Sequence, residues 1–385
     1  MKIFSSSQIQ EIDKQTIDKE PVSSIELMER ASTRFTRWFT NRFAPTQKVI
    51  VFAGGGNNGG DALAVSRLLI ERNYDVSVYL VITGDKISED CSINLKRIKN
   101  YIAPVIIDSK HADEFPILNG NEIIIDGIFG SGLNRPVEGF TGIVIQKINQ
   151  HKGTIISIDI PSGLFGEDNR KNNSENIINA SFTVSFEFPF LSFFMSENDP
   201  FVGEFFVIPI GLHQEAIDSM STSYNTIDAF QTAKLLIPRK KYSHKGTYGH
   251  ALIIAGSYGM MGAAVLSAKA SIRTGTGLTT LCIPDFGFQI MQTSVPEVIC
   301  VSAKSDSFFA DIPLLKNYRA IACGPAIGRS EITTKALHKL LLSAKVPVVL
   351  DADALNILAD HPQWLDLIPE GSVITPHPVE FDRLT

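Results

Sequence analysis

The stretch KVIVFAGGGNNGGDALAVSRLL, residues 48–69, joins an apolar run, a glycine-rich loop and a helical pattern without a break. The apolar run at 48–53 predicts a buried strand, and the spacing of apolar residues over 61–72 predicts a helix. A strand, a tight turn and a helix in this order open a β-α-β unit, which builds a parallel sheet. At such a turn, backbone N–H groups and the positive end of the helix dipole can receive a phosphate.

The glycine loop also matches a known fingerprint, because Gly54–Gly59 has the G-x-G-x-x-G spacing of dinucleotide-binding Rossmann folds. That fold places an acidic residue about 20 positions on, at the end of the second strand. Here the expected second strand covers 76–82, and Asp85 lies too far beyond it. An NAD-dependent oxidoreductase that uses this loop therefore stays an alternative, and so does a tight turn without a ligand.

The chain on both sides of this stretch repeats the alternation of short apolar runs and helical segments. Two helices come first, at 7–19 with Ser7 as N-cap and at about 23–43. The apolar runs are continuous, which is typical of parallel sheets covered on both faces. We expect the α/β fold class, with two domains that are each a mostly parallel sheet flanked by helices. The expected strands are 48–53, 76–82, 105–107, 122–126, 154–160, 250–255, 278–283, 320–323, 347–350 and 372–375, with a further helix at about 261–274.

Domain boundaries follow from a change of pattern in the middle of the 385-residue chain. After an aromatic-rich extended segment, a mixed, polar segment without a strand separates the two series. The first domain is expected at 1–212, a linker region at 213–243 and the second domain at 244–385. The two series share a class but no repeated sequence.

Composition excludes several classes of protein. The net charge of −6 argues against a general nucleic-acid binder, which normally has a basic surplus. The start of the chain has no apolar signal-peptide core, and no stretch of about 18 uncharged apolar residues predicts a membrane span. The cysteines have neither C-x-x-C nor zinc spacing, so we expect reduced thiols and a cytoplasmic location. They are Cys91, Cys282, Cys300 and Cys323.

Three polar loops follow expected strands of the first domain: the glycine loop, Asp126-Gly127-Ile128-Phe129-Gly130 and Asp159-Ile160-Pro161-Ser162-Gly163. In a parallel sheet these loops meet at the carboxyl ends of the strands, where open α/β sheets bind ligands. An aspartate at a strand end is also a common helix cap or turn former. Asn58, Asp126 and Ser162 together offer hard oxygen ligands suited to K⁺, Mg²⁺ or Ca²⁺ rather than zinc.

These three motifs, in this order, resemble the NAD(P)H-hydrate epimerase family over about residues 1–212. The resemblance implies a Rossmann-like epimerase domain that interconverts the R and S hydrates of NADH and NADPH with a bound K⁺. It implies that Asn58, Asp126 and Ser162 bind the cation. Asp159, at a strand end near the cation, is the candidate acid/base at C6 of the hydrated nicotinamide, and its alternative role is to anchor the ribose or the loop. Ala62 stands where the family often has glycine, and its methyl group should be tolerable. The resemblance assigns the hydrated nucleotide to Asn57, Asn58, Gly59, Gly60, Asp61, Gly130, Ser131, Gly132, Leu133, Asn134, Arg135, Pro136 and Asp159.

Glycine-rich motifs of the second half, such as 255–264 and 323–328, lack the lysine and hydroxyl residue of a P-loop. Together with His377-Pro378-Val379-Glu380 they resemble the NAD(P)H-hydrate dehydratase family, which has a ribokinase-like fold. The resemblance implies ADP- or ATP-dependent dehydration of the S epimer, and it leaves open whether Mg²⁺ is also required. It aligns Ala263, Ala326 and His377 with positions that contact the hydrate, although the family usually has glycine at 326. His377 alone could equally be structural.

One family feature is absent from residues 1–385: no Gly-Gly-x-Gly-Asp loop follows the motif at 377–380. In the family that loop supplies an anion hole and a catalytic aspartate. We therefore expect an incomplete ribokinase-like domain, truncated and deficient in dehydration. The remaining alternative to an enzyme is a non-catalytic nucleotide-binding protein, and a homo-oligomer stays open.

Overall fold

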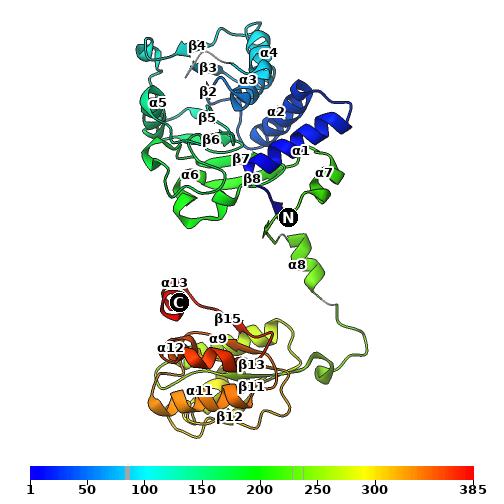
Figure 1. The fold of residues 1–385 in the computed structure, drawn as a ribbon, viewed down its shortest axis with the longest axis vertical. Coiled ribbons are helices and arrows are strands. Elements are labelled where there is room, and N and C mark those ends of the chain that lie inside the picture. The colour runs from blue at the N-terminus through cyan, green and yellow to red at the C-terminus, as the bar shows by residue number, and fades with distance from the viewer. Residues whose placement is uncertain (83–86, 228, 237) are drawn as a thin grey trace. The chain divides into compact units, whose positions relative to one another are not determined.

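The computed structural model describes residues 1–82, 87–227, 229–236 and 238–385 (Figure 1). Asp85, which bears on the oxidoreductase alternative, lies outside the described residues. The chain divides into two compact units, residues 1–236 and 237–385, called unit 1 and unit 2 below. Each contains a parallel sheet, so the predicted α/β class is confirmed.

Unit 1 is built on a seven-stranded, wholly parallel sheet with the order β4-β3-β2-β5-β6-β7-β8. Within this sheet the chain begins at β2, continues outward through β3 and β4, and then returns to β5 on the other side of β2. The order therefore reverses between β2 and β5, which makes this the topological switch point. The strands are β2 (Val49–Ala53), β3 (Val76–Val81), β4 (Val105–Ile107), β5 (Ile123–Gly127), β6 (Thr154–Ile158), β7 (Phe182–Phe186) and β8 (Glu204–Ile208).

Helices cover both faces of this sheet because successive side chains of each buried strand point to opposite faces. Val49 and Val51 pack with the helices α2, α3 and α4, whereas Ile50 and Phe52 pack with α5. Figure 1 shows these two groups of helices on opposite sides of the strands. The helices of unit 1 are α1 (Ser6–Lys19), α2 (Ser24–Thr40), α3 (Asn57–Ile70), α4 (Glu89–Ile98), α5 (Gly139–Asn149), α6 (Asp199–Val202), α7 (Gln214–Ser219) and α8 (Ala229–Leu235).

Two predicted helix starts were wrong. Helix α3 begins at Asn57 with Gly56 as N-cap, four residues before the expected start at 61. Gly59 and Gly60 weaken the helical pattern over the first turn of α3, although Gly59 allows this turn to pack closely against the loop that follows β2. Helix α1 is capped by Ser5 rather than Ser7, because Ser5 and Gln8 form a reciprocal capping box.

Residues expected in the strand-free linker belong partly to unit 1. Strand β9 (Tyr224–Asn225) pairs antiparallel with β1 (Lys2–Ile3). The Lys2 Nζ atom donates hydrogen bonds to the carbonyl oxygens of Ile217, Asp218 and Met220 at the end of α7. These contacts join positions more than 200 residues apart, and a two-residue strand leaves no pattern in the sequence.

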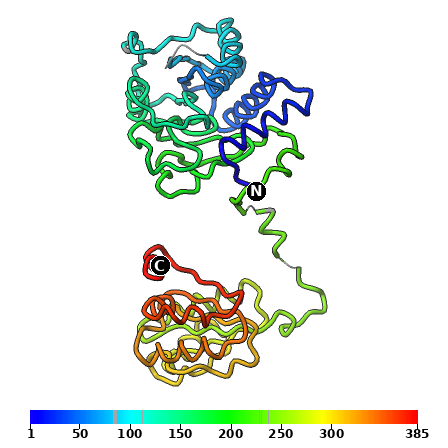
Figure 2. Tube along the Cα trace, viewed as in Figure 1, coloured from blue at the N-terminus to red at the C-terminus, as the bar shows by residue number. Residues whose placement is uncertain are grey.

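Unit 2 repeats the architecture with a six-stranded parallel sheet of order β12-β11-β10-β13-β14-β15. Figure 2 follows this chain, from yellow-green to red, as it alternates between strand and helix. Its switch point lies between β10 and β13. Strand β12 was not predicted. The elements are β10 (His250–Ile254), α9 (Met261–Arg273), β11 (Leu278–Ile283), α10 (Gly287–Ser294), β12 (Ile299–Ser302), β13 (Ala320–Cys323), α11 (Glu331–Ser343), β14 (Val348–Leu350), α12 (Asp353–Asp360), β15 (Val373–Ile374) and α13 (Pro378–Leu384).

Two general expectations can be checked against the described residues. None of the helices described is long and apolar enough to cross a membrane. All four cysteines are free thiols, and Cys91, Cys282 and Cys323 are buried. Burial raises the pKa of Cys91 to about 11, so this thiol stays protonated at neutral pH.

Candidate functional site

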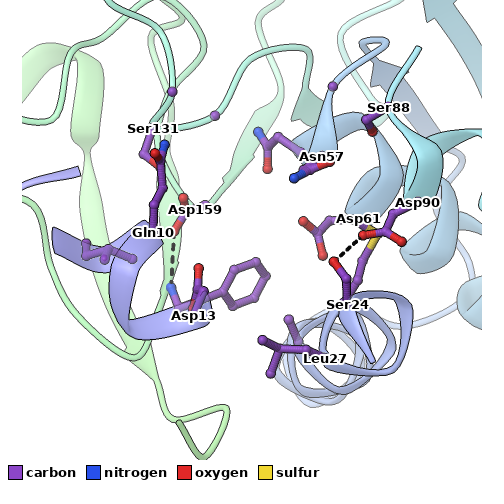
Figure 3. Close-up of a pocket in the computed structure, with 18 of the residues that line it drawn as sticks. Gln10, Asp13, Ser24, Leu27, Asn57, Asp61, Ser88, Asp90, Ser131 and Asp159 are labelled. Carbon is purple, nitrogen blue, oxygen red and sulfur yellow. Dashed lines mark hydrogen bonds between the residues drawn. The ribbon is translucent and has the colours of Figure 1, made fainter. Parts of the chain in front are cut away.

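A cavity of about 970 Å³ opens at the switch point of unit 1, beside the carboxyl ends of β2, β5 and β6 (Figure 3). Helices α1 and α2, which precede the sheet in the chain, form the wall facing these strand ends. A cavity of this size accommodates a small organic ligand. It is called the unit 1 cavity below.

The three fingerprint glycines of the first loop have different neighbours. An added Cβ at Gly54 would overlap the Ile128 carbonyl oxygen, and one at Gly59 would overlap the Gly54 carbonyl oxygen. The corresponding position at Gly56 has no atom within 4 Å. Gly54 and Gly59 are therefore required for backbone packing, whereas Gly56 leaves open space at the N-terminus of α3.

The nearby alanine that departs from the family pattern also fits. Ala62 is fully buried in α3. A Cβ added to Gly127 would lie only 2.6 Å from the Ala62 methyl group, which is too close for both. The glycine at the end of β5 thus provides the room that Ala62 needs. The tolerance expected from the sequence agrees with this packing.

The second loop is organised around Asp126, which is fully buried at the end of β5. Its Oδ2 accepts hydrogen bonds from Ser157 Oγ at 2.8 Å and from the Ser162 backbone N–H at 2.9 Å. Its Oδ1 accepts from Ser162 Oγ at 2.5 Å and from the Ile128 N–H at 3.2 Å. Burial raises the pKa of Asp126, and these donors oppose that rise.

Asn58 lies next to this network and has an unpartnered oxygen. Its Nδ2 donates to the carbonyl oxygens of Phe129 at 2.7 Å and Ile158 at 3.2 Å, while its buried Oδ1 has no hydrogen-bond partner. The Phe129 N–H donates in turn to Ser162 Oγ at 2.8 Å. An unsatisfied buried acceptor costs about 1–3 kcal/mol, so this oxygen calls for a cation or a water molecule. The structure thus brings Asn58, Asp126 and Ser162 together.

Asp159, the predicted acid/base, directly follows β6 and lines the cavity. Its backbone adopts the left-handed conformation with φ of 64°, which is uncommon outside glycine. Its Oδ1 accepts long hydrogen bonds from Ser185 Oγ at 3.3 Å and the Phe186 N–H at 3.4 Å. Burial raises the pKa of Asp159 to about 6, and these two hydrogen bonds oppose the rise.

Sequence reasoning missed two carboxyl groups that line the cavity, Asp13 on α1 and Asp90 on α4. Burial, together with the negative charges of Asp159 and Glu187, raises the pKa of Asp13 to about 7. A signal was present in the sequence, because Asp13 lies four residues from both Ile9 and Ile17 and so shares their apolar helix face. All three residues line the cavity.

Asp61, on α3, is a further carboxyl group that lines the cavity. Burial comes first among the causes that raise its pKa well above the ordinary value, and the charge of Asp159 adds to it. Ser32 Oγ donates a hydrogen bond to its Oδ1 at 3.2 Å. In Figure 3, Asp61 lies across the open space from Asp13 and Asp159.

The remaining residues that were assigned to the nucleotide divide into two sets. Those that line the cavity are Asn57, Asn58, Asp61, Gly130, Ser131, Gly132, Leu133 and Asp159. Those that are not among its lining residues are Gly59, Gly60, Asn134, Arg135 and Pro136.

In unit 2 the predicted contact residues lie on segments that follow β10, β13 and β15. The Gly256 N–H donates to the Pro325 carbonyl oxygen at 2.9 Å, which joins the first two loops at the switch point. Ala263 is in the first turn of α9, and Ala326 has a left-handed backbone with φ of 56°. That conformation explains why glycine is usual at 326 in the family that this half resembles.

His377 has a structural role in addition to any contact with a ligand. It is the N-cap of α13, and its backbone N–H donates to Glu380 Oε2 at 3.0 Å. Its ring Nε2 lies 3.3 Å from Glu380 Oε1, and its side chain is 59% exposed. The imidazole is therefore held at the helix start with one side open to solvent.

Comparison with protein families assigns the two units separately. Residues 24–191 match the family of the YjeF-related protein N-terminus. Residues 251–385 match the family described as NAD(P)H-hydrate dehydratase.

Several curated relatives match nearly the whole chain. The bifunctional NAD(P)H-hydrate repair enzyme Nnr of Coxiella burnetii is 30% identical over 384 residues, which is 99% of this chain and 75% of the relative. The enzyme of the same name from Moorella thermoacetica is 30% identical over 100% of this chain and 75% of its own length. That of Escherichia coli is 27% identical over 99% of this chain and 71% of its own.

Two solved structures each match part of the chain. The crystal structure of yeast ynu0 is 21% identical, with a TM-score of 0.48, and covers 60% of this chain and 98% of its own. An ADP/ATP-dependent NAD(P)H-hydrate dehydratase from Bacillus subtilis, co-crystallised with ATP/Mg²⁺, is 33% identical with a TM-score of 0.34. It covers 40% of this chain and 54% of its own.

Proposed function

The chain belongs to the family of bifunctional NAD(P)H-hydrate repair enzymes, and from this premise we propose that its two activities are divided between the units. Unit 1 interconverts the R and S hydrates of NADH and NADPH in the unit 1 cavity. Unit 2 is the ADP- or ATP-dependent dehydratase half, which acts on the S hydrate. The observation that carries the first assignment is the unit 1 cavity, whose carboxyl groups lie at the switch point beside the open N-terminus of α3.

The groups of unit 1 divide between binding and chemistry. The open space at Gly56 and the N-terminal turn of α3 suit the phosphates of the nucleotide. Asp159 then acts as the acid/base for the reaction at the hydroxyl-bearing C6 of the hydrated ring. A carboxyl whose pKa is about 6 has both of its protonation states available near neutral pH, as a general acid/base requires.

K⁺ is the cation that we assign to Asn58, Asp126 and Ser162. Two observations support the fit: the buried Oδ1 of Asn58 has no partner, and Asp126 forms no ion pair among the described residues. Amide, carboxylate and hydroxyl oxygens are hard ligands, which suit such an ion. Bound there, the ion would supply positive charge beside the buried carboxylate. Asn58 and Ser162 would hold the loops after β2 and β6 in place around it.

For unit 2 we propose that Ala263, Ala326 and His377 contact the hydrate and that ADP or ATP, with Mg²⁺, is the co-substrate. The Mg²⁺ proposal draws on the Bacillus subtilis relative that was co-crystallised with ATP/Mg²⁺. Residues 1–385 hold no Gly-Gly-x-Gly-Asp loop after Glu380. We therefore propose that a polypeptide limited to these residues does not dehydrate the hydrate at a measurable rate.

The test follows one purified epimer of hydrated NADH by NMR, with K⁺ and with Na⁺ in its place. We expect the other epimer to appear faster than the spontaneous background with K⁺, and Asp159→Asn to slow this by about 100-fold or more. Asp168→Asn is the matched control, because Asp168 is exposed and pairs with Arg170. Unchanged exchange in the Asp159 variant would remove its catalytic role. Adding ADP and Mg²⁺ then tests unit 2, where recovered NADH absorbance would contradict the proposed deficiency.

A further inference from the structure

Carboxyl groups from four elements line the unit 1 cavity: Asp13 on α1, Asp61 on α3, Asp90 on α4 and Asp159 after β6. Ser24 Oγ donates a hydrogen bond to Asp90 Oδ2 at 2.5 Å, which leaves Asp13, Asp61 and Asp159 as the groups nearest to the open space. None of them forms an ion pair with a cationic side chain in the part of the chain that the structure describes. The hydrogen bonds that Asp61 and Asp159 accept come from two hydroxyls and one amide. Their remaining lone pairs are therefore available to a ligand.

Asp13, Asp61 and Asp159 are distributed over two opposite walls of the cavity. Asp61 lies on one wall of the cavity, and Asp13 and Asp159 lie together on the wall opposite (Figure 3). A flat ring placed between these walls would present one face to each. Apolar side chains of Leu27 and Phe186 also line the space.

The charges around the cavity favour retention of a proton. Asp13 experiences the negative charges of Asp159 and Glu187, and Asp61 experiences those of Asp159, Asp13 and Asp90. Lys14 is the cationic residue of α1 that lines the same cavity. Like charges at such a site do not all ionise together, as in pairs of catalytic carboxyls. Near neutral pH the group therefore contains both protonated and ionised members, as an acid and a base acting together require.

This inference rests on the proposed epimerisation. The C6 carbon of the hydrated ring carries a hydroxyl and is bonded to the ring nitrogen. It can invert by losing its oxygen to give a planar carbon, or by opening the ring at the bond to nitrogen. An anionic cavity stabilises a cationic ring, which only the first route generates.

We propose that unit 1 inverts C6 by removing water from one face and adding water to the other, with Asp61 serving one face and Asp159 the opposite face. Asp13 is a positioning residue that shares the exchangeable proton with Asp159. The two directions of the reaction then use the same two carboxyls with their roles exchanged.

The step balances without any further reactant. A protonated carboxyl on one wall gives its proton to the C6 hydroxyl, and the C6–O bond breaks with its electron pair leaving on oxygen as water. The lone pair of the ring nitrogen forms a double bond to C6. A water molecule then bonds to C6 from the other face and gives a proton to the ionised carboxyl on that wall, while the nitrogen recovers its pair. No atom is oxidised or reduced, and one proton has crossed from wall to wall.

Oxygen exchange tests this route on the full chain. One epimer of hydrated NADH is incubated in H₂¹⁸O, and mass spectrometry follows ¹⁸O in both epimers above the spontaneous background. For the wild-type chain we expect every enzymatically inverted molecule to carry one solvent oxygen. Inversion with retention of ¹⁶O would overturn the inference while leaving the proposed function intact. A chain that does not speed inversion at all would instead overturn the proposed function.

The variants separate the two walls. Asp61→Asn should lower inversion by about 100-fold or more, while one epimer still exchanges its oxygen by losing and regaining water on the face that Asp159 serves. Asp159→Asn should leave exchange in the other epimer instead. A purely structural role would remove exchange from both epimers alike, and that result, or unchanged inversion, would overturn the assignment.

Folding is controlled in two ways. Asparagine at 61 keeps an acceptor for Ser32 Oγ, so the hydrogen bond within the fold is preserved. Ser32→Ala removes that bond and leaves the carboxyl, and it should retain inversion to within about tenfold. Asp75→Asn is the matched control, because Asp75 is exposed and directly precedes β3. Equal losses in Asp61→Asn and Ser32→Ala would mean that Asp61 acts only through its packing, which would also overturn the assignment.

Discussion

The two switch points have the same topology and different construction. In each unit the sheet order reverses between the first strand of the α/β series and a later one, β2 and β5 in unit 1 and β10 and β13 in unit 2. Both therefore bring two loops together at the carboxyl edge of a parallel sheet. In unit 1 the loops at this edge present carboxyl, amide and hydroxyl side chains. In unit 2 the corresponding loops are distinguished by several residues whose backbone has a positive φ.

The backbone angles make the contrast concrete. Around the unit 2 switch point, Gly256, Gly324, Ala326, Gly328 and Ala352 all have positive φ. Turns of this kind aim successive N–H groups into a concavity, which suits anionic ligands. In unit 1 Asp159 is the non-glycine residue with positive φ that lines the cavity. Topology thus determines where a ligand binds, and the loop residues determine which chemistry is offered.

The largest expected effects come from glycines that hold each switch point together. An added Cβ at Gly59 would overlap the Gly54 carbonyl oxygen, and one at Gly324 would overlap the Asp351 carbonyl oxygen. Backbone atoms cannot turn aside as a side chain can, so Gly59→Ala and Gly324→Ala should each destabilise their unit by about 3 kcal/mol or more. Hydrogen exchange resolved by peptide should show loss of protection in unit 1 for the first variant and in unit 2 for the second.

Matched controls exist in both units. Positions 56 and 262 have open space for a Cβ, so Gly56→Ala and Gly262→Ala should leave protection nearly unchanged. If Gly59→Ala also removed protection from unit 2, the two units would fold as one cooperative body. The comparison between two separately built sites would then fail.

Much of this architecture could be predicted from the sequence, for physical reasons. Continuous apolar runs such as 48–53 identify buried parallel strands, because both faces of the sheet are covered. Since such strands end at one edge, Asn58, Asp126 and Ser162 could be expected near one another before any coordinates existed. The hydrogen bonds from Asn58 to Phe129 in the second loop, and from Ser162 in the third loop to Asp126, agree with that expectation.

Other features could not be predicted, since they depend on contacts between distant parts of the chain. The apolar face that Asp13 shares with Ile9 and Ile17 marks this residue as unusual, but its place in the cavity depends on how α1 packs. Strand β9 has two residues, and it exists because β1 is there to pair with it. The early start of α3 depends on the close packing of Gly59 against the Gly54 carbonyl oxygen. Local propensity disfavours a helix at these glycines.

A smaller effect is expected in unit 1, where the buried negative charge of Asp13 should lower the free energy of unfolding. Asp13 titrates near 3.8 in an unfolded chain and near 7 in the folded one. Between these values the folded state binds more protons, so stability falls as the pH rises. Asp13→Asn removes this loss and should stabilise unit 1 by about 1 kcal/mol or more near pH 8. Chemical denaturation at several pH values measures the difference, which should disappear below about pH 4.

The same variant should affect activity in a way that packing alone would not. Asp13 titrates near 7, above Asp159 near 6, so the charge of Asp13 enters the cavity only on the basic side of the profile. Asp13→Asn should therefore leave the acidic limb of the pH–rate profile in place and change the profile above about pH 7. Glu11→Gln is the control, because Glu11 is exposed on the same helix and bonds only to Gln15 among the described contacts. A pH-independent gain in stability would contradict the role assigned to the Asp13 charge.

The smallest effect concerns the backbone of unit 2. Ala326 has φ of 56°, a conformation that costs a residue with a Cβ about 1–2 kcal/mol. Glycine adopts it freely but loses about 0.5–1 kcal/mol through the greater freedom of its unfolded chain, so Ala326→Gly should stabilise unit 2 by about 0.5–1 kcal/mol. Ala270→Gly, at an exposed position of α9, should instead destabilise it by about 1 kcal/mol. Denaturation that resolves unit 2 compares the two. If both substitutions destabilise, the left-handed backbone at 326 is not under strain, and the idea that unit 2 builds its site from backbone loses its energetic support.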